Sequence, residues 1–198
     1  MVLSRRSRPR RTAERCPASG RDPRHAAAAL TLVAAVALLL PVPAAQAEGP
    51  AGPYDRAFLT DMVGHHAMAV DMAEMAREKA THDELEQAAE EIIRTQTAEI
   101  RRMRAWLRNW YGKRRVQLQL DHHEMIQMDE LEAGTGSAFE VRFLALMSVH
   151  HTQAIERAQV AVRRARHPAV RKLARAIMTA QQGEIDQFRD WLVRWYAS

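Results

Sequence analysis

Apolar residues recur every three or four positions through most of the chain after residue 54, which is the spacing of one face of an α-helix. The pattern predicts one helix from about Asp55 to Lys79 and a second from about Glu84 to Tyr111. Two further long helices are expected, from about Ser137 to Arg166 and from Pro168 to Tyr196, with a shorter helix or helical crossover between Val116 and Leu131. No stretch alternates with the period of two that a half-buried strand requires. The sequence therefore predicts an all-α fold.

The two helical hairpins contain the same sequence motif, and all matched positions are separated by the same number of residues. Phe58-Leu59-x-x-Met62-x-x-His65-His66 recurs as Phe143-Leu144-x-x-Met147-x-x-His150-His151, and the correspondence continues without a gap. Further matched pairs are His82 and His167, Gln96 and Gln181, Glu99 and Glu184, and Tyr111 and Tyr196. Two hairpins of similar sequence are expected to pack about a pseudo-twofold axis as a four-helix bundle.

The segment 1–47 has the features of a leader and is excluded from the fold. Arginines between Arg5 and Arg11 precede an apolar run from Ala26 to Leu40, and Ala45-Gln46-Ala47 offers a cleavage site of small residues. The run is shorter than the roughly 20 residues of a membrane span. A cleaved secretory signal peptide is expected, which implies an extracytoplasmic protein; an uncleaved anchor, the only predicted membrane contact, is the alternative. The expected organisation is a signal peptide over 1–47, a linker over 48–53 and one bundle over 54–198, with repeat one at 54–111, a crossover at 112–138 and repeat two at 139–196.

Removing the leader changes the charge of the protein. The whole chain has 29 Lys and Arg against 24 Asp and Glu, and the leader holds 8 of the former and 2 of the latter. The remainder is close to neutral, so the sequence pI near 10.0 reflects the leader and gives no support to nucleic-acid binding. Cys16, the single cysteine, also lies in the leader, which leaves the mature chain without disulfides or thiolate ligands.

Glu99 and Glu184 fall where an apolar side chain is expected, on the buried seam of their helices. A carboxylate in a core is costly unless it is paired, protonated or bound to a metal. The turn of the first hairpin centres near His82, and His66 and Glu99 lie almost equally far from it on either side. Because each helical residue rises about 1.5 Å, these two side chains are expected to be nearly level. By the same argument His151 faces Glu184.

Each hairpin is also expected to bring methionines to the level of its His and Glu side chains, so that these residues form one layer. One histidine of each adjacent His-His pair is expected to point to a flank of the helix. The first layer would combine Met62, Met103, Glu99 and either His65 or His66. The second would combine Met147, Glu184 and either His150 or His151. Imidazoles and carboxylates converging inside a bundle are typical of a metal site. Thioethers shift the preference toward copper, with zinc as the alternative.

The two copies differ in methionine content, so copper chemistry is expected to favour the first. The first copy has Met62, Met68, Met72 and Met75, whereas the second keeps Met147 and has Gln153, Arg157 and Val160 at the other places. The middle segment adds the further potential ligands His122, His123, Met125 and Met128.

A structural interpretation competes with metal binding. A His–Glu layer can serve only to fix packing, and methionine is an ordinary filler of core gaps. The chain has no G-x-S-x-G motif, phosphate-binding glycine loop or H-E-x-x-H motif, and no Glu-x-x-His of the di-iron bundles. The sequence therefore indicates no reaction, no catalytic residue and no cofactor-binding residue, and it leaves homo-oligomer formation open.

The motif F-L-x-x-M-x-x-H-H-x-x-A-[VI] occurs twice, at Phe58–Val70 and Phe143–Ile155. It resembles the signature of domain-of-unknown-function family 305 (DUF305). The resemblance covers about Tyr54 to Tyr196. It implies a ferritin-like helical bundle, usually exported, and some relatives are associated with extracytoplasmic copper binding and copper tolerance. The signature continues as Met72-Ala73 in the first copy, where the second has Arg157-Ala158. The ligands implied by the motif are Met62, His65, His66, Met72, Met147, His150 and His151.

The leading hypothesis from the sequence is an exported protein that sequesters or delivers copper through Met, His and Glu side chains inside the bundle. The alternative is a structural or interaction module whose His–Glu layers only specify packing.

Overall fold

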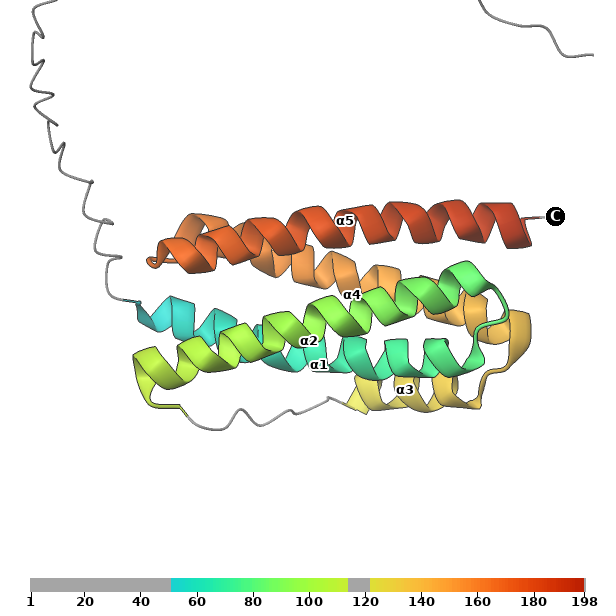
Figure 1. Ribbon diagram of the computed structural model, residues 1–198, viewed down its shortest axis with the longest axis horizontal. Helices are drawn as coiled ribbons and strands as arrows, with labels where there is room; N and C mark the ends of the chain where they lie inside the picture. The colour runs from blue at the N-terminus through green and yellow to red at the C-terminus, as the bar shows by residue number, and fades with distance from the viewer. Residues whose placement is uncertain (1–50, 114–121, 198) are drawn as a thin grey trace, which may run out of the picture. The chain divides into compact units, whose positions relative to one another are not determined.

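The computed structural model describes residues 51–113 and 122–197, which form five helices (Figure 1). They are α1 (Pro53–Lys79), α2 (Asp83–Tyr111), α3 (His122–Ala133), α4 (Gly136–Arg164) and α5 (Pro168–Tyr196). The prediction of an all-α bundle is confirmed for this part of the chain. The four long helices begin and end within about two residues of their predicted positions, because caps and prolines are local signals.

The long helices form two hairpins, α1 with α2 and α4 with α5, and α1 packs against α4 between them. The short helix α3 contacts both α1 and α4. Pro53 and Pro168 begin α1 and α5, where the missing N–H of proline costs nothing. Gly112 ends α2 in the left-handed conformation, with φ of 64°.

Two buried carboxylates join the hairpins at opposite ends of the bundle. Near the start of α4, Glu140 accepts hydrogen bonds from the backbone N–H of Thr81 (2.6 Å) and of His82 (2.9 Å) in the α1–α2 turn. Near the start of α1, Asp55 accepts from the backbone N–H of His167 (3.2 Å) in the α4–α5 turn. The start of α4 therefore lies beside the end of α1, and the start of α1 lies beside the end of α4. The two helices run antiparallel.

We call these two sets of hydrogen bonds around Glu140 and Asp55 the carboxylate clasps, and side chains add to them in different ways. His82 Nδ1 lies 2.7 Å from Glu140 Oε2, and the Tyr196 hydroxyl donates to the same carboxylate. At the other end Tyr111, which matches Tyr196 in the repeat, donates to the carbonyl of Gly52 at 2.8 Å. Tryptophans stack in pairs near the ends of α2 and α5, Trp106 on Trp110 and Trp191 on Trp195. His82 and His167 stack on the second tryptophan of the opposite hairpin, at 4.0 and 4.2 Å between ring centroids.

The apolar core consists of two clusters, one toward each end of the bundle. The first contains Leu59, Met62, Met103 and Leu107, and the second contains Met72, Leu85, Phe143, Met147 and Phe188. Polar side chains from the middle of all four long helices lie between the two clusters. This arrangement sets the position of the candidate site.

Candidate metal centre

A layer of polar residues crosses the centre of the bundle, and most of it is inaccessible to solvent. His66 and His151 are 0% exposed, and His150 is 5% exposed. Gln96 on α2 and Gln181 on α5 are each 3% exposed. Burial of this much polar surface is costly unless the groups find partners. The layer therefore requires an explanation of its own.

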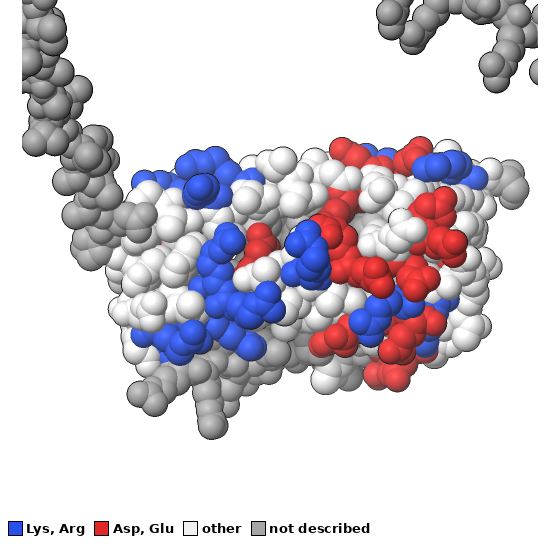
Figure 2. Space-filling view, in the orientation of Figure 1, with Lys and Arg blue, Asp and Glu red and all other residues white. Residues whose placement is uncertain are grey.

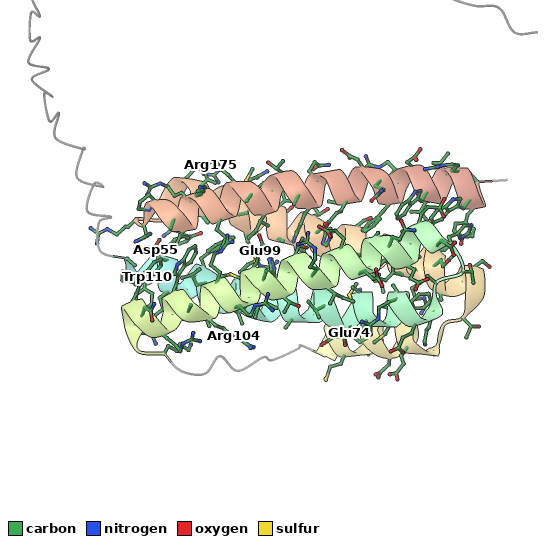
Figure 3. All side chains as sticks on the ribbon, viewed as in Figure 1. Asp55, Glu74, Glu99, Arg104, Trp110 and Arg175 are labelled. Atoms are coloured by element: carbon green, nitrogen blue, oxygen red, sulfur yellow. The ribbon has the colours of Figure 1, made fainter. Side chains whose placement is uncertain are left out.

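Each helical hairpin pairs one histidine with one glutamate, as the positions on either side of the turn predicted. His66 Nε2 and Glu99 Oε2 are joined by a hydrogen bond of 2.8 Å. His151 Nε2 lies 2.6 Å from Glu184 Oε2, but the two groups are not aligned for a hydrogen bond. Both glutamate side chains are 21% exposed, so they lie at the rim of the layer and not deep in the core. Glu99 is labelled in Figure 3. This partial exposure lowers the cost of keeping the carboxylates charged.

The other histidine of each pair also points inward, which corrects the expectation that it would lie on a flank. The rings of His65 and His150 stack across the α1–α4 interface, with centroids 3.6 Å apart and planes inclined by 32°. The ring nitrogens of both are buried and form no aligned hydrogen bond within residues 51–113 and 125–197, although the Gln153 side chain lies near enough to His65 to raise its pKa. The reason is the antiparallel packing of α1 against α4, which turns adjacent positions of both helices toward the same central interface.

Burial keeps the stacked histidines uncharged near neutral pH. Desolvation is the largest cause that lowers the pKa of His65 to about 3, and the Arg157 guanidinium adds to it. The pKa of His150 is lowered well below its usual value by desolvation and then by His65. A neutral imidazole has one nitrogen with a free lone pair, which is the form that binds metal ions. The layer thus holds imidazoles in the neutral form that can bind a metal ion, with ring nitrogens that form no aligned hydrogen bond to a described residue.

Two glutamines belong to the layer although they were not among the predicted site residues. Both amide atoms of the Gln96 side chain, and the amide oxygen of Gln181, are buried and have no hydrogen-bond partner among the described residues. The signal that could have identified them is their match between the two repeats, on the same seam as the glutamates. A buried carboxamide with an unpaired oxygen can accept from a ligand or a water molecule.

The predicted methionine ligands are divided between the two apolar clusters. Met62 and Met103 are 0% exposed and lie in the same cluster, in agreement with their predicted level. Met147 lies in the other cluster with Met72, so Met72 does not adjoin Met62. Of the methionines in the middle segment, Met125 is 45% exposed. The side chains of His122 and His123 lie outside the described residues.

The donor chemistry fits a soft or borderline cation, but the side chains are not yet arranged around one point. Within residues 51–113 and 125–197, no three His, Asp or Glu side chains converge closely enough to hold a metal ion. The ring of His150 nevertheless lies beside those of His65 and His151, at 3.6 and 6.2 Å between ring centroids, and the nitrogens of all three rings are buried. The role of these residues as ligands therefore stays a prediction.

The family profile called "Domain of unknown function (DUF305)" matches residues 55–192. The chain belongs to the DUF305 family. The match spans both helical hairpins, so the resemblance to DUF305 that the repeated His-His motif indicated is confirmed. None of the curated proteins is significantly similar to this DUF305 chain.

Solved structures of DUF305 proteins and of CopM share the fold. CopM in its Cu(I)-bound form is 34% identical, with a TM-score of 0.64, over 72% of this chain and 97% of CopM. A DUF305 fragment from Deinococcus radiodurans is 27% identical, with a TM-score of 0.66, over 73% of this chain and 99% of that fragment. A DUF305 protein from Streptomyces coelicolor, whose assignment as secreted is itself a prediction, is 28% identical, with a TM-score of 0.63, over 71% of this chain and 91% of its own.

CopM has also been solved in Cu(II)-bound, Ag-bound and apo forms. These structures suggest metal binding at the level of the family. None of the five described helices of this chain has the length and apolarity that crossing a bilayer requires.

Proposed function

We propose that this chain is an exported metal-binding protein that takes up copper in the central polar layer and sequesters or delivers it. The observation that carries the proposal is the stack of His65 on His150, two imidazoles whose buried ring nitrogens form no aligned hydrogen bond with any described residue. Such groups are costly to leave unsatisfied, and a bound cation would satisfy them.

The layer offers a route by which a cation could reach these imidazoles. Glu99 and Glu184 are partly exposed and each lies against a fully buried histidine. A cation arriving from solvent would meet a carboxylate at the rim before it met an imidazole. A glutamate that accepts a hydrogen bond from one ring nitrogen also fixes which nitrogen is free to bind, a usual role for carboxylates beside ligating histidines.

Copper is the proposed ion because soft ligands lie on both sides of the layer. Met62 and Met103 are buried in the adjoining cluster on one side, and Met147 is buried in the cluster on the other. Thioethers favour Cu(I), and imidazole suits both copper and zinc, so zinc remains the alternative ion. The Cu(I)- and Cu(II)-bound forms of CopM support the same choice. An extracytoplasmic location, after removal of the predicted leader, belongs to this proposal.

Titration of the exported protein with Cu(I), Cu(II), Ag(I) and Zn(II), followed by calorimetry or chelator competition, tests the proposal. We expect Cu(I) and Ag(I) to bind more tightly than Zn(II). Changing His66→Ala together with His151→Ala, or His65→Ala together with His150→Ala, should weaken binding at least tenfold. The matched control is His82→Ala, which removes an imidazole from a carboxylate clasp outside the layer. Weak binding of all four ions, unchanged in both double variants, would refute copper binding in the layer.

A structural role for the layer is the second candidate. It is favoured by the hydrogen bond between His66 and Glu99, which satisfies that pair without a metal. In this case the layer only fixes the register of the helices, and His66→Ala lowers stability by the same amount with and without metal. A melting temperature that rises on addition of copper and falls again with chelator would count against it.

A further inference from the structure

On the face shown in Figure 2, most Lys and Arg gather toward one end of the bundle and most Asp and Glu toward the other. We call the basic end the part formed by residues 51–62, 100–113 and 157–178, which holds 13 Lys and Arg against two Asp. The acidic end, formed by residues 68–97, 125–147 and 185–197, holds 14 Asp and Glu against six Lys and Arg. The chain without its leader is close to neutral, so its composition conceals this separation.

Both aspartates of the basic end are already engaged. Asp55 is buried and accepts hydrogen bonds from backbone N–H groups. Asp61 pairs with Arg157 at 3.0 Å. The other cations include Arg108, Arg163, Lys172 and Arg175, which are exposed and form no ion pair with any described residue. The basic end therefore carries uncompensated positive charge toward solvent.

Aromatic rings accompany these cations at the same end. Trp110 (Figure 3), Tyr54 and Tyr111 are half-buried there. The Arg164 guanidinium lies 4.9 Å from the centroid of the Tyr54 ring. A surface hollow beside them is lined by Tyr111, by the cations Arg56 and Lys113, by the polar side chains of Thr60 and of Asp61, which is paired with Arg157, and by small apolar residues. Tyrosine and tryptophan mixed with basic residues are typical of surfaces that meet lipid headgroups.

The connectivity of the chain points to the same end. The linker that follows the leader joins the bundle at the start of α1, which is part of the basic end. If the leader were retained as an anchor, this end would be held next to the bilayer. If the leader is removed, the positive charge remains available to bind anionic headgroups directly.

We propose that the basic end binds the surface of a membrane containing anionic lipids, with the acidic end directed away from it. Salt screens electrostatic attraction over a distance of about 8 Å, and several cations of the basic end could come that close to one membrane surface. Their individual attractions to anionic lipid would then sum. Lipid is favoured over nucleic acid because the aromatic rings lie among the cations and because the linker from the leader arrives at the same end.

Vesicle co-sedimentation tests the proposal, using the exported protein in EDTA so that no metal bridges protein and lipid. Vesicles of phosphatidylcholine with about a third phosphatidylglycerol are compared with vesicles of phosphatidylcholine alone. We expect binding to the anionic vesicles to be at least about tenfold stronger and to be lost in high salt. A variant with Arg108→Gln, Arg163→Gln, Lys172→Gln and Arg175→Gln should lose this binding.

The matched control changes net charge by the same amount at the acidic end, through Arg77→Gln, Arg94→Gln, Arg189→Gln and Arg194→Gln. This control should keep its binding, and circular dichroism checks that both variants are folded. Equal loss in the two variants would overturn the proposal, because net charge and not the basic end would then control binding. The proposal would also be overturned if the protein failed to bind anionic vesicles, whether or not it bound a single-stranded oligonucleotide tightly.

Discussion

His65 of α1 and His150 of α4 lie ring against ring at the centre of the bundle, with centroids 3.6 Å apart. The two residues occupy the same place in the two repeats and meet where the antiparallel helices cross. Their ring nitrogens are buried and form no aligned hydrogen bond in the part of the chain that the structure describes. Two neutral imidazoles tolerate such a contact, whereas two imidazolium ions at this distance would repel each other. The contact therefore links stability to pH as well as to metal binding.

The free energy of unfolding of the metal-free protein is expected to fall as the pH is lowered below about 6.5. The folded state holds the pKa of His65 at about 3, against 6.5 for an unperturbed histidine, and lowers that of His150 in the same direction. Between these values the unfolded chain binds protons that the folded chain does not. Each such histidine can contribute up to about 1.4 kcal/mol per pH unit.

Chemical denaturation in EDTA between about pH 7 and pH 5 measures this slope. The carboxylate of Glu140 does not interfere, because its lowered pKa stabilises the fold above 4.5 and this contribution is lost only as the pH falls toward about 2. A variant with His65→Asn and His150→Asn should lose most of the slope. An unchanged slope in that variant would contradict the assignment.

Substitution of Glu140 is expected to destabilise the bundle strongly. Hydrogen bonds from Tyr196, His82 and Thr81 outweigh the effect of burial and lower the pKa of this carboxyl to about 2. Glu140→Gln leaves donors unpaired in a buried clasp and should cost about 3 kcal/mol or more. The control is Glu130→Gln, which removes an exposed ion pair with Arg142 and should cost less than about 1 kcal/mol. Equal losses in the two variants would show that the clasp does not hold the hairpins together.

Methionine substitutions should separate packing from copper binding. Met62→Leu and Met103→Leu conserve side-chain volume, so each should change stability by less than about 1.5 kcal/mol. If their thioethers bind copper, the double variant should lose at least about tenfold in Cu(I) or Ag(I) affinity, because leucine has no donor atom. Met75→Leu, at a half-buried position on the same helix as Met62, is the control. Unchanged affinity in the double variant would assign Met62 and Met103 to packing alone.

Arg157 is expected to weaken cation binding in the second copy. It occupies the position that corresponds to Met72, pairs with Asp61 at 3.0 Å and lies close enough to lower the pKa of His65. Arg157→Met should raise Ag(I) affinity several-fold, because a positive charge near the imidazoles is removed. Arg142→Met, which breaks an exposed ion pair on the same helix, is the control. An equal effect of both substitutions would point to net charge, and lower affinity in Arg157→Met would contradict the prediction.

The pairing of His66 with Glu99 could be predicted from the sequence because it depends on two local quantities. The position of the turn near His82 and the rise of an α-helix place the two residues at one level. The inward position of His65 could not be predicted in the same way. It depends on which face of α1 meets α4, and that is set by packing between two hairpins far apart in the sequence.

The sequence by itself determined the four long helical segments, the matched positions of the two repeats and the two His–Glu pairs, because helix period, caps and rise are local properties of the chain. Only the tertiary structure decided three further features: the stack of His65 on His150, the buried clasps of Asp55 and Glu140, and the separation of the basic and acidic ends. Each depends on α1 and α4 running antiparallel, which brings together groups that the sequence keeps far apart. The physical reason is that side-chain packing across the bundle, and not the periodicity of any one helix, selects which faces and which ends meet.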